Sequence, residues 1–188
     1  MERREFTQKL LALGVCPAVL MNLGGFDVFA KGKTADDNEL ETLKSQKEFI
    51  QNWLADLLDS MDKVIDRETQ VKIIEGCGRQ CFNRHQFKKD IAAKGTGDID
   101  KLIEAYSQNF EIWKDGNTVH IRYGETSAQC YCPAANYREA KPNDLHCECT
   151  RMTHQSIFET ALGKPIKVDI AESLRRGGKT CHFIAHVE

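Results

Sequence analysis

The chain has 188 residues, with 26 Lys and Arg against 28 Asp and Glu, a formal net charge of −2. This length suits one domain, and a balanced charge without a basic stripe or polybasic run argues against nucleic acid or anionic lipid as partner. Eight cysteines are dense for an ordinary intracellular protein, so the compartment and the state of the thiols must be considered together.

The N-terminus has the composition of an export signal. Arg3 and Arg4 precede a mostly apolar, Gly-containing run over residues 10–26, and small residues allow cleavage after Ala30. The run is too short and too interrupted by Gly and Pro to be a convincing membrane span. It resembles a bacterial twin-arginine signal, a pathway that exports proteins already folded.

Residues 1–30 are therefore predicted to be a signal segment and residues 31–188 a single cysteine-rich domain. The mature chain is expected in the periplasm if the signal is used, and in the cytoplasm otherwise. Two alternatives stay open. Cys16 lies where a lipoprotein could be cleaved and lipidated, and the segment could instead be a leader helix that stays attached.

The front of the domain has helical periodicity. Apolar residues recur at spacings of three and four from Leu40 to Ile65, which predicts one long helix with a single apolar stripe. Asp66 can cap a second helix that runs through 76-GCGRQCFNRHQF-87. A third helix is expected over residues 98–110.

The back of the domain alternates with a period of two. Residues 111–114 and 118–123 flank Asp115-Gly116-Asn117, a hairpin signal, and a further strand is expected over 129–132. A helix over 149–162 ends at Gly163, and two strands follow over 166–172 and 180–187. These elements predict an α+β fold, an antiparallel sheet with helices packed on one face.

The cysteines occur in three spaced pairs. On an extended strand, residues i and i+2 point to one side, so Cys130 with Cys132 and Cys147 with Cys149 would each present two sulfurs to one face. Cys77, Cys81 and His85 recur every four residues, which places them along one face of a helix. We expect the three segments to converge on a thiolate cluster that binds a metal ion.

Two other states of the cysteines stay open. Disulfides are favoured if the chain is exported, although the seven cysteines after residue 30 leave at least one unpaired. A free cysteine can also pack as a small hydrophobic residue.

Thiolate ligands together with imidazole favour zinc, with an iron–sulfur centre as second choice. The predicted metal ligands are Cys77, Cys81, Cys130, Cys132, Cys147, Cys149, Cys181, Glu172 and His85. Further candidates are His146, Glu148, His154, and the pair His182 and His186 on one strand face opposite Cys181.

The segment 147–187 resembles the end of the 4-vinyl reductase domain family, a small-molecule-binding α+β fold. The resemblance rests on Cys149 before a helix, Leu162-Gly163, a strand ending at Glu172, Gly177-Gly178, and the closing 181-CHFIAH-186. The Gly-Gly-x-x-Cys-x-Phe ending is also similar to the L-2-amino-thiazoline-4-carboxylate hydrolase family, whose Cys-Pro segment would correspond to Cys132-Pro133.

The first resemblance implies a structural zinc, because Cys149, Glu172 and Cys181 match three positions that hold it in sensor members of that family. The fourth position is Arg175 here, so Cys147, Cys132 or the helical pair would have to supply the missing ligand.

The sequence thus favours a domain that binds a small molecule, of unknown identity, next to a thiolate metal site. The alternative from the second resemblance is a hydrolase of a cyclic C–N bond, with Cys81 or Cys132 as nucleophile. A third alternative is an exported domain held by disulfides without metal. The sequence does not decide whether the protein is an enzyme.

Overall fold

The computed structural model describes the backbone of residues 35–188 and the side chains of residues 38–188. Residues 43–188 form one compact unit. Of the preceding unit, residues 1–42, only the start of the first described helix is included. The predicted signal segment and Cys16 lie outside the described residues, so export and lipidation stay predictions.

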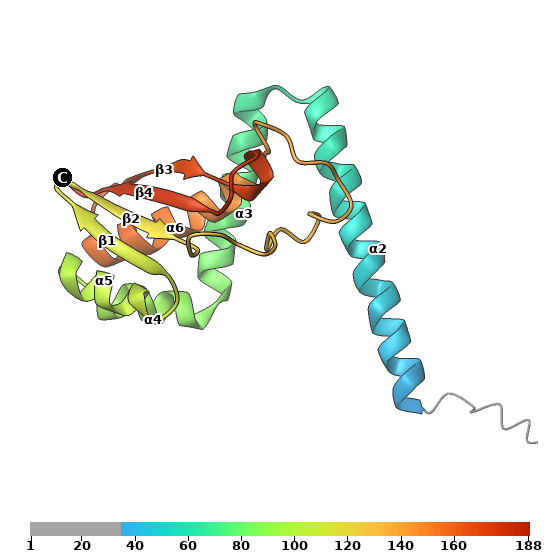
Figure 1. Cartoon of the computed structure of the whole chain (residues 1–188), viewed down its shortest axis with the longest axis horizontal. Helices are drawn as coiled ribbons and strands as arrows, with labels where there is room; N and C mark the ends of the chain where they lie inside the picture. The colour runs from blue at the N-terminus through green and yellow to red at the C-terminus, as the bar shows by residue number, and fades with distance from the viewer. Residues whose placement is uncertain (1–34) are drawn as a thin grey trace, which may run out of the picture. The chain divides into compact units, whose positions relative to one another are not determined.

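The fold is α+β, as predicted: a four-stranded antiparallel sheet carries helices on one face (Figure 1). In chain order the elements are α2 (Ala35–Val64), α3 (Arg67–Arg84), α4 (Gln86–Lys94), α5 (Ile99–Ser107), β1 (Glu111–Asp115), β2 (Thr118–Arg122), α6 (Cys147–Leu162), β3 (Lys167–Glu172), the short 3₁₀ helix η2 (Leu174–Arg176) and β4 (His182–His186).

The strand order is β1-β2-β4-β3, with every neighbouring pair antiparallel. The predicted hairpin is confirmed, and Gly116 occupies its turn with φ +54°, a conformation that glycine adopts without steric cost. Alternation along β2 and β4 buries Val119, Ile121, Phe183 and Ala185 on the inner face. These side chains form the main core with residues of α4, α5 and α6.

The outer face of the sheet carries polar and aromatic residues. His182 and His186 share this face of β4, as predicted. The imidazoles of His120 and His182 contact each other, with 2.9 Å between Nδ1 and Nε2, and Trp113 stacks on His120. The face opposite the helices therefore has its own aromatic cluster, separate from the inner core.

Asp66 caps α3 as predicted, since its carboxylate accepts the backbone N–H of Thr69 at 3.0 Å. The prediction that α3 continues to residue 87 is wrong. His85 has extended backbone angles, φ −97° and ψ 111°, and a separate helix, α4, begins at Gln86. The break ends the expected row of Cys77, Cys81 and His85, because the third member leaves the helix.

The predicted strand placement of both Cys-x-Cys pairs is also wrong. Residues 129–132 lie in the irregular segment between β2 and α6, and Cys147 and Cys149 form the first turn of α6. Successive residues of an α-helix are rotated by about 100°, so Cys147 and Cys149 point to nearly opposite sides. The apolar positions from Met152 onward belong to α6, and this helix begins at Cys147 instead of at residue 149 as expected. Both cysteines are therefore helical.

The connection over residues 123–146 is held by buried charges instead of a strand ladder. The carboxylate of Asp144 accepts two hydrogen bonds from Arg138 and one from Arg175. Arg138 also reaches Asp59 and Asp62 on α2. This network fixes the irregular segment against α2 and the turn after β3, so the segment keeps a defined path without regular structure.

The apolar stripe predicted on α2 is divided. Ala55, Leu58 and Met61 are buried in a second core cluster with α3 and the 123–146 segment. Other apolar positions of α2, among them Ile50 and Trp53, are exposed. Among the helices that the structure describes, none is long and apolar enough to cross a membrane.

Candidate functional site

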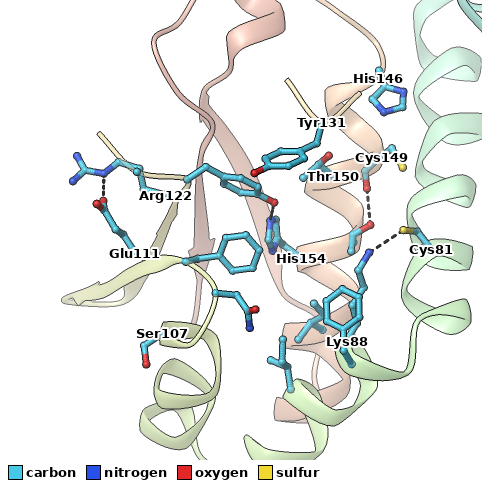
Figure 2. A pocket seen from close by; sticks show the side chains of 18 of the residues that line it. Cys81, Lys88, Ser107, Glu111, Arg122, Tyr131, His146, Cys149, Thr150 and His154 are labelled. Carbon is cyan, nitrogen blue, oxygen red and sulfur yellow. Dashed lines mark hydrogen bonds and ion pairs between the residues drawn. The ribbon is translucent and has the colours of Figure 1, made fainter. Parts of the chain in front are cut away.

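A cavity of about 1030 Å³ opens between α3, α4 and α6 on one side and the 123–146 segment with the ends of β1 and β2 on the other. Figure 2 shows that its labelled side chains come from all of these elements. Its lining is mainly apolar and aromatic, with Phe87, Ile91, Phe110, Tyr131 and Ile157 among the contributors. Cavities of this size and character bind small organic molecules.

The close packing of α3 on α6 places both helices at the cavity wall. A Cβ on Gly78 would overlap the carbonyl oxygen of Cys149, so glycine permits this approach. The hydroxyl of Thr153 donates to the carbonyls of Gly78 (3.1 Å) and Cys149 (3.0 Å). The side chains of Cys81 and Cys149 are consequently both found in the lining.

One polar contact of the wall joins Lys88 on α4 to Cys81 on α3. The ammonium Nζ lies 2.9 Å from the sulfur, and Figure 2 shows both groups at the same end of the cavity. No carboxylate pairs with Lys88 within the described part of the chain. An ammonium beside a sulfur is an arrangement that favours thiolate nucleophiles and anionic ligands.

His154 of α6 lies at the back of the cavity and is buried. Its Nδ1 contacts the hydroxyl of Tyr106 (3.1 Å) and its Nε2 the hydroxyl of Tyr123 (3.0 Å). Burial, and secondarily the charge of Lys88, lowers the pKa of His154 from 6.5 to about 3. The imidazole is therefore neutral near pH 7, donating to one tyrosine oxygen and accepting from the other hydroxyl.

Tyr123 and His154 are the members of this network that line the cavity, whereas Tyr106 does not. Burial raises the pKa of Tyr123 above its usual value, so its hydroxyl stays protonated. A neutral hydroxyl backed by a neutral imidazole is suited to orienting a polar group of a ligand by hydrogen bonding. It is not suited to supplying a charge at physiological pH.

At the rim, Arg122 of β2 donates from Nε to Glu111 of β1 at 2.6 Å (Figure 2). The guanidinium also lies over the ring of Trp113, 5.3 Å from its centroid. Because Arg122 is already paired with a carboxylate, Lys88 is the cation of the lining that is open to an anionic ligand.

The cysteines form two groups instead of one cluster. Cys149 is near Cys77 and Cys81, whose proximity adds to burial in raising the pKa of Cys149 to about 11. Cys147 points elsewhere, and its sulfur lies 2.9 Å from the hydroxyl of Ser173. Cys130 is near Cys132 and Cys181, since it acts on the pKa of both, and Cys181 acts on the pKa of Cys147; Cys130 and Cys149 both pack against the core cluster that contains Cys132.

None of the seven cysteines in the described part of the chain forms a disulfide. Nor does any group of three or more His, Cys, Asp and Glu side chains, within residues 38–188, have an arrangement that could hold a metal. Glu172 accepts the backbone N–H of Lys179 at 2.6 Å, closing the turn between β3 and β4. No zinc or iron–sulfur centre is therefore assigned to these residues, and both cofactors stay predictions.

The remaining predicted candidates have structural partners. His85 is exposed, its ring packs beside that of Phe87, and its backbone N–H donates to the carbonyl of Cys81. Glu148 is paired with Arg151 and Arg176. His146 is in the cavity lining, and burial lowers its pKa.

Sequence reasoning did not identify Lys88 or the two tyrosines as site residues. Lys88 follows the break at His85, so the period of α3 does not lead to it. For His154 a signal exists, because Ile157, Phe158 and Ala161 follow it at spacings of three, four and seven on the buried face of α6. A histidine on such a face must have its polar atoms satisfied by buried partners.

The thiols are predicted to differ strongly in their rate of alkylation. Cys77 is exposed, whereas burial raises the pKa of Cys147 to about 11. We expect iodoacetamide at pH 7.5 to label Cys77 at least about 100-fold faster than Cys147, because only the thiolate reacts and access is restricted. Timed labelling with peptide mass spectrometry measures both rates. Equal rates in the folded protein would contradict the assignment, while equal rates in denaturant are the control.

Comparison with protein-family models finds no match to this chain, and a search of curated proteins also finds none. The resemblances of residues 147–187 therefore stay predictions.

Proposed function

We propose that this domain binds a small, largely apolar molecule carrying an anionic group in the cavity between α3, α4, α6 and the 123–146 segment. The observation that carries the proposal is the environment of Lys88. This lysine lies in a mainly apolar lining, donates a hydrogen bond to the sulfur of Cys81, and pairs with no carboxylate of the described residues.

The lining supports the apolar part of such a ligand. The ring of Phe110 is tilted against that of Tyr123, with centroids 4.7 Å apart, and the centroid of the Tyr131 ring lies 6.2 Å from that of Tyr123. Tyr131 is 78% exposed, which leaves much of its ring free for contact with a bound molecule. Aromatic surfaces of this kind bind planar or aliphatic groups through burial of apolar area.

The polar groups support a defined orientation. Cys81 and Lys88 come from helices α3 and α4, while Tyr123 directly follows strand β2 and its hydroxyl is held by His154. A ligand with its anion at Lys88 and a hydrogen-bonding group toward Tyr123 would use both. Such convergent polar groups in an apolar cavity are what fix the orientation of small ligands.

The test uses 8-anilinonaphthalene-1-sulfonate as an apolar anion and N-phenyl-1-naphthylamine as its neutral counterpart. Lys88→Met is expected to weaken binding of the sulfonate by roughly 10- to 100-fold, the effect of removing a charge-assisted hydrogen bond. Affinity for the neutral probe should stay unchanged. Fluorescence titration of the full chain measures both.

Lys89→Met is the matched control, because Lys89 is the next residue of α4 and is not in the cavity lining. A probe molecule that binds apolar residues outside the cavity, such as those of α2, should bind equally well to the wild type and to Lys88→Met. If Lys88→Met lowered the affinity for both probes equally, the variant would have changed the shape of the cavity and not only its charge. No loss of the sulfonate would overturn the proposal.

A second candidate function is hydrolysis of a cyclic C–N bond, and the Cys81–Lys88 contact favours it. In this reaction Cys81 attacks the electrophilic ring carbon as the thiolate, and the C–N bond breaks as the leaving nitrogen takes a proton from the ammonium of Lys88. Water then cleaves the S–C bond: its hydroxyl adds to the carbon, its proton returns to the Lys88 amine, and the thiolate is restored.

L-2-amino-thiazoline-4-carboxylate is the first substrate to test for this activity, since it names the hydrolase family that the chain's ending resembles. Product formation is followed by NMR for the wild type and for Cys81→Ser. Turnover that disappears in Cys81→Ser, with probe binding intact, would support the enzyme. Absence of turnover leaves the binding proposal as the better account.

A further inference from the structure

The exposed side of α2 carries an apolar stripe with a seven-residue repeat. Leu43, Ile50, Leu57 and Val64 follow one another at intervals of seven, and they are 55%, 60%, 39% and 78% exposed. Trp53, 57% exposed, lies three residues after Ile50. Monomeric soluble proteins rarely expose a contiguous apolar patch larger than a few hundred Å². We call these five residues the α2 stripe.

The stripe has the register of a coiled-coil seam. If Leu43 and its repeats are a positions, the d positions are Gln46, Trp53 and Ser60, so the seam is uncharged over three heptads. Helix α2 as a whole contains eight acidic and three basic residues. Charges are thus numerous on the helix but absent from this line between Leu43 and Val64, whereas the preceding heptad has Asp36 and Glu39 at the same positions. A sustained seven-residue apolar repeat is the pattern of helices that supercoil around a second helix.

The other residues that the structure describes leave this line exposed. Ala55, Leu58 and Met61 of α2 pack against α3 and the 123–146 segment, and they lie on the neighbouring side of the helix. The α2 stripe is therefore separate from the helix's own core contacts. It can accept another helix without displacing them.

We propose that the α2 stripe is an interface with a second copy of this chain, in which two α2 helices form a short coiled coil. A seam of this kind is self-complementary, so two copies bury the same residues on both sides. The net acidity of α2 disfavours an anionic membrane surface as the occupant, whereas two copies can keep these charges off the seam, since no a or d position from Leu43 to Val64 is charged. The chain's own residues 10–26 are a poorer match, because Gly14, Pro17 and Gly24-Gly25 interrupt any continuous helical repeat.

The experiment is sedimentation velocity of the full chain from about 1 to 100 μM, the range in which weak and moderate dimers separate. The wild type is expected to sediment as a dimer, twice the 21.3 kDa of the chain. The double variant Ile50→Glu/Leu57→Glu should raise the dissociation constant by roughly 100-fold or more, because each interface would contain four unpaired carboxylates.

Ser45→Glu/Asn52→Glu is the matched control, since it adds the same charge to exposed positions on another side of α2. It should leave the dimer intact. Unchanged circular dichroism and thermal midpoint show that the variants fold. A second variant, Ile50→Ser/Leu57→Ser, removes the apolar groups without adding charge and should also weaken the dimer. A monomeric wild type, or a dimer unaffected by both stripe variants, would overturn the proposal.

Discussion

Asp144→Ala is expected to lower the free energy of unfolding by about 3–5 kcal/mol, the range found when one partner of a buried ion pair is removed. The Asp144 side chain is fully buried and accepts hydrogen bonds from Arg138 and Arg175, both largely buried. Without the carboxylate, two guanidinium groups lose their shared counter-charge. Because Arg138 keeps Asp59 and Asp62, the lower end of the range is expected. Urea unfolding at pH 7 measures the effect.

Asp62→Ala is the control for this prediction. Asp62 accepts from Arg138 and Lys141 at a partly exposed edge of the same network, where ion pairs contribute about 0–1 kcal/mol. The two variants should therefore differ by at least about 2 kcal/mol. If Asp144→Ala is no more destabilising than Asp62→Ala, the network does not hold the 123–146 segment.

The network also bears on the binding site. Tyr131 and His146 enter the cavity lining from the segment that Asp144 fixes. Asp144→Ala should consequently weaken binding of both the sulfonate and the neutral probe, whereas Lys88→Met weakens only the first. Comparing the two variants therefore distinguishes the contribution of the cavity's shape to binding from the contribution of its charge.

His154 is expected to make the protein less stable in acid. The pKa of His154 is about 3 in the folded chain against 6.5 for an unperturbed histidine, so below pH 6.5 the unfolded chain binds a proton that the folded chain does not. This contribution to stability is fully present above pH 6.5 and is lost as the pH falls toward 3. The loss is about 1.4 kcal/mol per pH unit between pH 6 and 4, or about 2.5 kcal/mol from pH 7 to 4.5.

His154→Gln keeps a donor and an acceptor for Tyr106 and Tyr123 but does not titrate. Its stability deficit relative to the wild type should therefore shrink by about 2.5 kcal/mol between pH 7 and pH 4.5. His85→Gln, at an exposed position, is the matched control and should run parallel to the wild type. Urea unfolding curves at several pH values give the comparison. A constant deficit for His154→Gln would show that the imidazole is not held neutral.

Much of the secondary structure followed from local patterns. The 111–115 and 118–122 hairpin was predictable because Asp-Gly-Asn supplies the turn conformation and the flanking residues alternate. Asp66 was recognisable as a cap because its carboxylate precedes the first helical turn of α3. The fold class followed from the order of such segments.

The misplaced segments are those where distant partners decide. The Gln129–Cys132 segment has the alternation of a strand, but buried arginines and Asp144 fix the connection that contains it. His85 continues the period of α3, yet the chain breaks there to start α4. The Cys-x-Cys pair at 147 and 149 was placed on a strand, and its helical conformation sends the two sulfurs apart. The periodicity of a segment does not show its contacts with residues that are distant in the sequence.

Composition and short-range periodicity are enough to predict the antiparallel α+β architecture, the apolar periodicity of α2 and the unusual density of thiols. They do not predict which thiols are neighbours, that Lys88 contacts the sulfur of Cys81, or that some apolar residues of α2 are exposed; these depend on the tertiary structure. The reason is physical. Neighbours in a site come from separate elements, and their distances depend on how helices cross and where they break, which local propensity does not encode.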